Sequence, residues 1–289
     1  MSQNIKDPTP GRLKKVFRSK WFWGLGVLSV LILLTLIAIP AVHNHRVIQR
    51  ISALGGSFGV IEPDANTVPI LSRFRFNIWG NNTFIKLDSI SRLYLHNTSV
   101  GDSDLNWLSD LTNLECLYLS KTQVSDAGLD RLKSFTKLEF LFLNDTQVGN
   151  AGLIHLKGLA NLKHLYLHNT QVSDAGLIHL KGHQKLERLW LDQTNITDSG
   201  LLHLKKFKRL KRLSLKGTKV TDSGIIQLTD LKDLNYLDLS NTQITDAGLM
   251  QLKECSNLGT LYVKDTQVTE AGLAQLKALL PDCVITAGP

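Results

Sequence analysis

The sequence predicts an α/β solenoid of short repeats that follows one N-terminal transmembrane helix. Two observations lead to this prediction: an apolar run of twenty-two residues without a charge, and a pattern that recurs every 24 residues through most of the remaining chain. With 43% hydrophobic and 20% charged residues, the chain has the composition of a protein that buries a core, which argues against disorder. We expect five segments: a basic tail (1–20), a transmembrane signal-anchor helix (21–42), a linker with an N-terminal cap (43–83), a solenoid of about eight units (84–280) and a C-terminal cap (281–289).

The net charge of +8 is concentrated in the N-terminal tail. The first twenty residues hold six Lys and Arg but one Asp, so this tail carries five of the eight charges. The other 269 residues carry only +3, which is weak for a surface that binds phosphates, and we expect no nucleic-acid partner. The three cysteines are too few and too irregularly spaced for a disulfide framework or a zinc site. We therefore expect no metal and no cofactor.

The apolar run extends from Trp21 to Val42 and is long enough to span, as a helix, the roughly 30 Å hydrocarbon core of a bilayer. Trp21 and Trp23 lie at its start, where indole rings favour the membrane interface. Six basic residues precede the run, and Arg46 and Arg50 follow it. This asymmetry predicts a single-pass protein whose N-terminus is cytoplasmic and whose repeats are periplasmic or extracellular. The alternative is a cleaved signal peptide, although the run exceeds the usual apolar region of about 7 to 15 residues.

The repeat is defined by columns of residues that recur 24 positions apart without an insertion. A glycine and an acid recur at this step, and Asn150 alone interrupts the acidic column. Such regularity predicts a stack of like supersecondary units. The threonine column consists of Thr98, Thr122, Thr146, Thr170, Thr194, Thr218, Thr242 and Thr266.

Each unit reads approximately LxxLxLxxTxVTDAGLxxLKxL, which the stretch from Leu237 to Lys253 shows most clearly. In this pattern the chain resembles the leucine-rich-repeat family, and its TDAGL variant resembles the short repeats of bacterial, planctomycete-type proteins and of eukaryotic F-box adaptors. The resemblance covers about Phe84 to Ile285 and departs from the commonest pattern in carrying threonine where asparagine or cysteine usually occurs. It implies a curved solenoid with a parallel sheet on the concave face and short helices on the convex face.

The alternation of residues around Leu117 predicts the strand of each unit independently of that resemblance. Leu117 and Leu119 alternate with residues of other kinds, which is the period of a half-buried strand whose leucines face inward. We expect Leu117 to pair with Leu141 of the next unit, and Leu141 with Leu165, so that the strands form a parallel sheet.

After the strand and its turn, the chain is expected to form one or two helical turns. Val124, Leu129 and Leu132 should continue the core. Asp126 is expected to cap the helix, and Lys133 to lie at its C-terminal end, where a cation is favourable to the helix dipole. The threonine hydroxyls should satisfy backbone groups of the turn that would otherwise be buried unpaired.

Both ends of the solenoid need a cap, since a terminal unit exposes an apolar face. At the N-terminus the candidates are the segment Val47 to Leu54, the Gly55–Gly56 pair and the alternating segment Ser72 to Trp79. At the C-terminus, a last half-unit is expected whose strand ends before Gly288.

The central column of outward-facing strand residues is the candidate binding site. Its first five members are aromatic, and at a strand spacing of about 4.8 Å they would form a stripe on the order of 20 Å long on the concave face. Large apolar surfaces usually mark interaction sites. The alternative is that the rings only stabilise the sheet as a cross-strand ladder. We assign ligand binding to Tyr94, Tyr118, Phe142, Tyr166, Trp190 and Tyr262, with Arg188, Arg212 and Lys216 beside them.

The three basic residues of this set lie beyond the aromatic half, so a ligand with an apolar stretch and an acidic end would match the face. A histidine column on the helices is too widely spaced for zinc. No nucleophile motif or phosphate-binding loop interrupts the repeat, which predicts a protein that is not an enzyme.

These observations predict a non-catalytic, membrane-anchored module that binds a protein, peptide or glycan on the non-cytoplasmic side. Two alternatives remain open. One is a structural envelope protein that self-assembles through the solenoid. The other is a substrate-recognition adaptor, as the resemblance to F-box proteins implies.

Overall fold

The computed structural model describes residues 39–60 and 90–287. The chain divides into two compact units, Met1–Gln49 and Arg50–Pro289, and the helix α2 (Ile39–Ala53) crosses their boundary. The predicted transmembrane segment 21–42 lies outside the described residues except for its last positions, 39–42. Among the helices of the two described ranges, none is long and apolar enough to cross a membrane.

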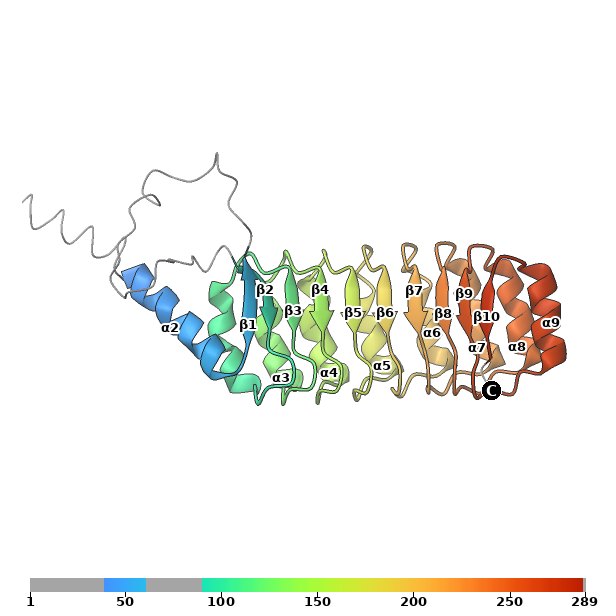
Figure 1. Cartoon of the computed structure of the whole chain (residues 1–289), viewed down its shortest axis with the longest axis horizontal. Coiled ribbons are helices and arrows are strands. Elements are labelled where there is room, and N and C mark those ends of the chain that lie inside the picture. Colours follow the sequence, from blue (N-terminus) through green and yellow to red (C-terminus); the bar gives the residue numbers. More distant parts are fainter. Residues whose placement is uncertain (1–38, 61–89, 288–289) are drawn as a thin grey trace, which may run out of the picture. The chain divides into compact units, whose positions relative to one another are not determined.

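The second unit is built on one sheet. Within the described residues its ten strands follow one another in sequence order; β1 is antiparallel to β2, and every later pair is parallel. Figure 1 shows the strands side by side in one layer and the helices in a second layer behind them. The strands are β1 (Ser57–Val60), β2 (Ile90–Tyr94), β3 (Cys116–Tyr118), β4 (Phe140–Phe142), β5 (His164–Tyr166), β6 (Arg188–Trp190), β7 (Arg212–Ser214), β8 (Tyr236–Asp238), β9 (Thr260–Tyr262) and β10 (Val284–Thr286).

The helical layer consists of short helices, most of them one α-turn continued by a 3-10 turn. The α-helices are α3 (Asp126–Leu129), α4 (Asn150–Leu153), α5 (Asp174–Leu177), α6 (Asp198–Leu204), α7 (Asp222–Ile225), α8 (Asp246–Gln251) and α9 (Glu270–Leu279). The 3-10 helices are Asp102–Asp110, Asp130–Leu132, Ile154–Gly158, Ile178–Leu180, Ile226–Asp230 and Leu252–Glu254.

The core between the two layers is a stack of leucines in register. Leu117 pairs with Leu141 and Leu141 with Leu165, and all three side chains are fully buried. Leu129 and Leu132 close the core from the helical side, also without exposed surface. Burying one such side chain stabilises the fold by roughly 1.5–3 kcal/mol, so the repeated leucines are the main source of stability. The predicted parallel sheet of inward-facing leucines is confirmed.

A turn with a fixed hydrogen bond follows each strand from β2 to β9. Lys121 has φ 55°, in the left-handed region, and the next residue, Thr122, donates its hydroxyl hydrogen to the carbonyl oxygen of Leu119 at 2.6 Å. The predicted structural role of the threonine column is therefore confirmed. The turn positions that share the positive φ are Asn97, Asp145, Asn169, Gln193, Gly217, Asn241 and Asp265, and the same hydroxyl bond forms at each following threonine.

The acidic column has a different role from the one that the sequence suggested. Asp126 does not cap its own helix; Ser125 is the N-cap, and its hydroxyl accepts a hydrogen bond from the backbone N–H of Ala127. Asp126 instead accepts a hydrogen bond from the backbone N–H of Gly149 in the next unit, at 2.6 Å. The prediction that Asp126 caps the helix is wrong, because Asp126 is itself the first residue of the helix and its carboxylate bonds to the following unit.

These side chains act as clamps between consecutive units. Asp198 accepts hydrogen bonds from both the backbone N–H and the hydroxyl of Thr221, at 2.8 and 2.6 Å. Asn150, which interrupts the acidic column, preserves the clamp: its carbonyl accepts from the N–H of Ser173, and its amide donates to the Ser173 hydroxyl. Hydrogen bonds to a charged group stabilise by about 1.5–3 kcal/mol, so the column contributes to the stacking of units.

The glycine column leaves room for these clamps. A Cβ placed on Gly176 would lie 2.6 Å from the side-chain oxygen of Asn150, closer than real Cβ atoms approach. The same collision would occur at each of the other members of the column. Glycine is therefore required by the side chain of the preceding unit.

The two end strands of the sheet pair with the repeat in different ways. At one end β1 pairs antiparallel with β2, with a register shift between Gly59 and Val60. At the other end β10 pairs in parallel with β9 and ends at Thr286. The segment Ser72 to Trp79, which the sequence suggested as part of the N-terminal cap, lies outside the described residues.

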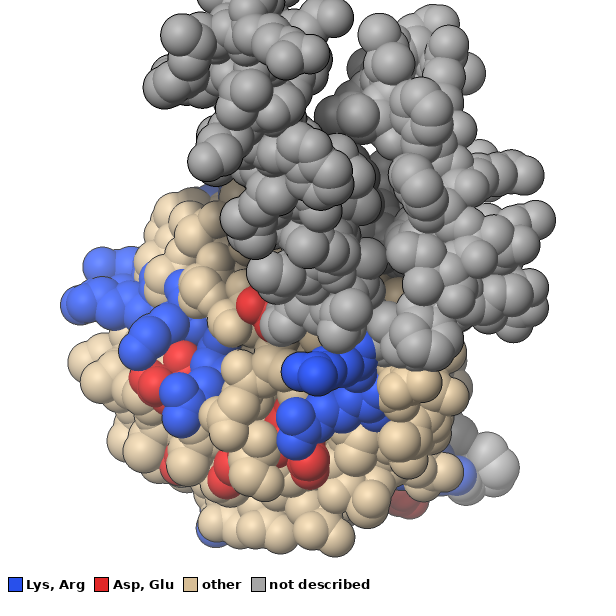
Figure 2. All heavy atoms as spheres, turned by 90° about the vertical axis from the view of Figure 1, so that its left-hand side faces the viewer, with Lys and Arg blue, Asp and Glu red and all other residues tan. Residues whose placement is uncertain are grey.

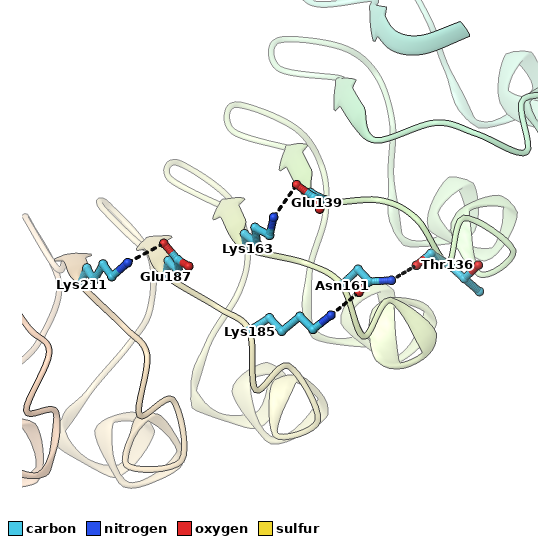
Figure 3. A network of polar contacts seen from close by, with 7 residues as sticks. All are labelled: Thr136, Glu139, Asn161, Lys163, Lys185, Glu187 and Lys211. Atoms are coloured by element: carbon cyan, nitrogen blue, oxygen red, sulfur yellow. Dashed lines mark hydrogen bonds and ion pairs between the residues drawn. The ribbon is translucent and has the colours of Figure 1, made fainter. Parts of the chain in front are cut away.

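Polar side chains tie the units together along the border between sheet and helices (Figure 3). Lys163 contacts Glu139 at 2.8 Å and Lys211 contacts Glu187 at 3.0 Å, each lysine reaching back by one unit. Exposed ion pairs of this kind contribute only about 0–1 kcal/mol each. Further bonds drawn in Figure 3 run from the Asn161 amide to the carbonyl of Thr136 and from the Lys185 ammonium to the side-chain oxygen of Asn161.

Candidate functional site

Side chains that alternate with the strand leucines point away from the core and form one surface, here called the strand face. The parallel register places Tyr94 beside Tyr118, Phe142 beside Tyr166, and Tyr166 beside Trp190. Because every strand carries the same phase, side chains 24 residues apart are nearest neighbours. All five side chains are half-buried.

The rings of this column form a continuous stack. Ring centroids lie 4.7 Å apart for Tyr94 and Tyr118, 4.1 Å for Tyr118 and Phe142, 4.4 Å for Phe142 and Tyr166, and 5.0 Å for Tyr166 and Trp190. The interplanar angles are 19°, 9°, 14° and 25°. The separations are close to the spacing of neighbouring strands, so the ring planes lie roughly perpendicular to the direction in which the units stack.

This geometry determines which part of each ring a ligand can reach. The faces of Tyr118, Phe142 and Tyr166 are covered on both sides by their neighbours. The surface that remains consists of ring edges and tyrosine hydroxyls. The edge of an aromatic ring is the electropositive part of its quadrupole, so this surface favours carbonyl and carboxylate oxygens over cations.

Beyond Trp190 the next ring of the stack comes from a different column of the strand face. The next position of the column is Ser214, which is buried, and Tyr236 from the neighbouring column takes over: its ring lies 6.1 Å from Trp190 and 5.5 Å from Tyr262. Sequence reasoning placed Tyr262 in the site without Tyr236. The sequence did contain a signal for Tyr236: the small side chain of Ser214 on β7 leaves a space that the ring of Tyr236 on β8 can fill.

The aromatic half of the strand face carries little charge. Burial, together with the positive charge of Arg188, lowers the pKa of His164 to about 4, so this imidazole is neutral at pH 7. Burial raises the pKa of Tyr118 to about 12 and keeps the phenol protonated. His164 also packs edge-on against Phe140, with 4.6 Å between ring centroids. Arg92 on β2 is exposed and charged, and the rest of the outward-facing strand residues from β2 to β5 are neutral.

Charge is concentrated at and beyond β6. Arg188 and Arg212 are direct neighbours in the sheet, and the guanidinium of Arg212 lies 6.0 Å from the ring centre of Tyr236. Lys216, two residues after β7, is exposed. On the same face, burial raises the pKa of Asp192, with a further contribution from the nearby Asp238 carboxylate. The face therefore offers basic groups at its middle and acidic groups beside them.

Figure 2 shows the side of the molecule that lies at the left in Figure 1. There, Lys and Arg side chains lie in separate groups, with acidic side chains between them. The described part of the chain also holds no group of three or more His, Cys, Asp or Glu side chains placed to bind a metal ion. Its cysteines, Cys116, Cys255 and Cys283, are buried, and burial raises the pKa of the Cys255 thiol to about 11, which disfavours the reactive thiolate.

Comparisons with known proteins agree with this architecture. Two stretches, residues 110–133 and 231–253, match the family described as Leucine Rich repeat. The solved structure of internalin C2 from Listeria monocytogenes is similar over 72% of this chain and 86% of its own, with 28% sequence identity and a TM-score of 0.59. A second internalin from the same organism, internalin F, matches over 71% of this chain and 83% of its own, with 18% identity and a TM-score of 0.32. No curated protein sequence gives a significant match.

The family match and the first of these structures support a leucine-rich-repeat scaffold, a type of protein that is typically non-enzymatic and binds other proteins. The particular likeness to planctomycete-type and F-box repeats has no counterpart among these matches. In repeat scaffolds of this type the extended concave surface is commonly used for binding.

Proposed function

We propose that this leucine-rich-repeat protein is a non-catalytic binding module that holds an extended segment of a protein or peptide partner against the strand face. The observation that carries the proposal is the continuous stack of aromatic rings from Tyr94 to Trp190 on an otherwise solvent-facing layer. Rigid aromatic side chains add contact area at low cost in side-chain entropy. Nothing in the repeat itself requires aromatic residues there, because β7 and β8 carry Ser214 and Asp238 at the same position.

The stacking favours a polypeptide partner over a glycan. Sugars bind aromatic side chains mainly through the ring faces, and these faces are occupied by neighbouring rings. The exposed edges and hydroxyls suit the carbonyl oxygens of an extended backbone. Arg188, Arg212 and Lys216 support a partner that carries carboxylates where its chain passes beyond Trp190.

The proposal includes a membrane tether. The uncharged run from Trp21 to Val42 would span the bilayer, with the basic tail in the cytoplasm and the repeats on the periplasmic or extracellular side. The partner would then be a protein of the envelope or of the exterior. Extraction of membranes with alkaline carbonate tests the tether: the chain should stay in the pellet, and its release would contradict this part of the proposal.

Selection of peptides tests the binding face. The intact chain, held in detergent micelles, is used to select from a displayed library of random peptides, and the selected peptides are then titrated. Replacing Tyr118 and Tyr166 by alanine should weaken their binding by about thirtyfold or more, since central aromatic residues typically contribute about 2 kcal/mol or more each. The matched control is the double variant Ile178→Ser with Leu202→Ser, because both residues lie on the helical side and are about half exposed. Peptides that bind the alanine variant as well as the original chain would contradict the proposal.

A further inference from the structure

A second apolar surface lies on the helical side of the solenoid. Four large aliphatic residues recur there at the 24-residue step and remain about half exposed: Ile154 (49%), Ile178 (44%), Leu202 (52%) and Ile226 (52%). The core does not need them, because Leu153, Leu177, Leu201 and Ile225 at the preceding position are fully buried. We call the surface formed by Ile154, Ile178, Leu202 and Ile226 the helix stripe.

Small residues widen the helix stripe. Ala151, Ala175 and Ser199 lie three positions before the aliphatic residues of their units, on the same side of the helix, and all three are exposed. Between two units the surface is hollowed into a shallow depression, lined by Ile154 and Ile178 together with Lys157, His179 and Lys181. The stripe is therefore a continuous strip of aliphatic and small side chains.

A row of lysines runs along the stripe, again at the 24-residue step. Lys157 and Lys181 are exposed and, within the described residues, form no ion pair. The flanking members of the row do have acidic partners: Lys133 lies 3.1 Å from Asp130, and Lys205 lies 3.9 Å from Asp230. The two uncompensated lysines thus accompany the aliphatic centre of the stripe, and its acids lie at the ends.

The acids nearest the centre of the stripe are already engaged. Asp174 accepts hydrogen bonds from the N–H and hydroxyl of Thr197, and Asp198 accepts them from Thr221. His155, at one end, contacts Asp130 at 3.3 Å. Asp174 and Asp198 keep their negative charge, but their carboxylates are bonded to the next unit and only partly exposed, whereas Lys157 and Lys181 are exposed beside the aliphatic side chains.

Aliphatic side chains flanked by lysines are the composition of a surface that rests on a membrane. At an interface, aliphatic groups enter the boundary between headgroups and acyl chains, and lysines extend to the lipid phosphates. A protein partner is less well matched, because protein interfaces are depleted in lysine and anchored by Trp, Tyr and Arg, none of which belongs to the stripe. We propose that the helix stripe docks the solenoid on an anionic lipid bilayer.

Docking by this surface would leave the strand face free, since helices and strands form opposite layers of the unit (Figure 1). The stripe does not depend on the proposed partner of the strand face. The proposed tether would only hold the solenoid near the bilayer and so raise the effective concentration of lipid.

Lysine footprinting on the intact chain tests the proposal. The chain is reconstituted into vesicles of phosphatidylcholine alone or of equal parts phosphatidylcholine and phosphatidylglycerol, and acetylation of each lysine is followed by mass spectrometry. Lys157 and Lys181 should react about fivefold or more slowly in the anionic vesicles. Lys121 and Lys264, which are exposed away from the stripe, are the internal controls and should react equally in both.

The double variant Ile178→Ser with Leu202→Ser should restore the reactivity of Lys157 and Lys181, and it should fold because both side chains are about half exposed. Equal reactivity in the two kinds of vesicle, or an equal loss at all four lysines, would overturn the proposal. Protection in neutral vesicles that grows with protein density would indicate a second copy of the chain and would also overturn it. Retention after alkaline extraction is scored separately, so a failed tether and a failed stripe give different results.

Discussion

The two halves of the strand face share one interior and differ in what they present outward. From β2 to β6 the central column is Tyr94, Tyr118, Phe142, Tyr166 and Trp190, whereas at β7 and β8 it is Ser214 and Asp238. Behind both halves the leucines, the threonine turns and the clamps between units are the same. The difference separates what stacking of units requires from what it leaves free. The aromatic column belongs to the second class.

The largest expected effect is one that should not distinguish the halves. Leu165→Ala in the aromatic half and Leu237→Ala in the other half should each lower the free energy of unfolding by about 3–5 kcal/mol, because both side chains are fully buried and the repeat leaves little room to collapse around the cavity. Urea unfolding followed by circular dichroism measures both. Costs that differ by more than about 2 kcal/mol would show that the interior is not equivalent.

The clamps should give the next largest effect. Asp198→Ala leaves the N–H and hydroxyl of Thr221 without their partner and should lower the free energy of unfolding by about 1–3 kcal/mol. Asn150→Asp restores the acidic column and should change the free energy of unfolding by less than about 0.5 kcal/mol. The reason is that the N–H and hydroxyl of Ser173 can donate hydrogen bonds to a carboxylate as those of Thr221 do. A large loss of unfolding free energy in Asn150→Asp, measured by the same assay, would show that Asn and Asp are not interchangeable in the clamp.

A double-mutant cycle sharpens the comparison at the level of the rings. For the Tyr118 and Phe142 pair, whose centroids lie 4.1 Å apart at 9°, the coupling energy should be about 1 kcal/mol. For the tilted pair Tyr236 and Tyr262, at 5.5 Å and 47°, it should be smaller. Unfolding of the single and double alanine variants supplies the values. Equal coupling energies for the two pairs would mean that parallel stacking of the rings adds no stability beyond that of a tilted contact.

The last expected effect concerns the dependence of stability on pH. The pKa of His164 is lowered to about 4 in the folded chain from 6.5, so between these values the unfolded chain binds more protons than the folded one. Stability should therefore rise with pH from about 4 to 6.5 and be lost as pH falls through this window. His164→Gln should flatten the dependence, as urea midpoints across the window would show. An unchanged slope in His164→Gln would place the titrating group elsewhere.

Much of the fold follows from periodicity that is visible in the sequence. The step of 24 residues and the alternation around Leu117 predict the parallel register, because a shift by one residue would turn every leucine outward. The role of Asp126 could not be predicted in the same way. A helix cap and a bond to the next unit leave the same recurring acid in the sequence, and only the direction of the carboxylate distinguishes them.

The candidate site shows the same division. The aromatic column could be predicted, since strand phase fixes which side chains face outward. The entry of Tyr236 into the stack, and the covering of the ring faces, depend on side-chain angles that no spacing encodes. The helix stripe could not be predicted from the sequence. Ile154 and its equivalents directly follow a buried aliphatic residue, and periodicity alone does not show which of two adjacent aliphatic residues is exposed.

The central claim is that the strand face, and not the helical side, binds a polypeptide. The most direct test is the dissociation constant of a peptide selected on the intact chain, measured by fluorescence anisotropy for the original chain, for Tyr118→Ala with Tyr166→Ala, and for Ile178→Ser with Leu202→Ser. We expect a loss of about thirtyfold or more in the first variant and a change below about twofold in the second. Equal affinity in the aromatic variant, with its fold intact by circular dichroism, would show that the aromatic column does not bind the peptide.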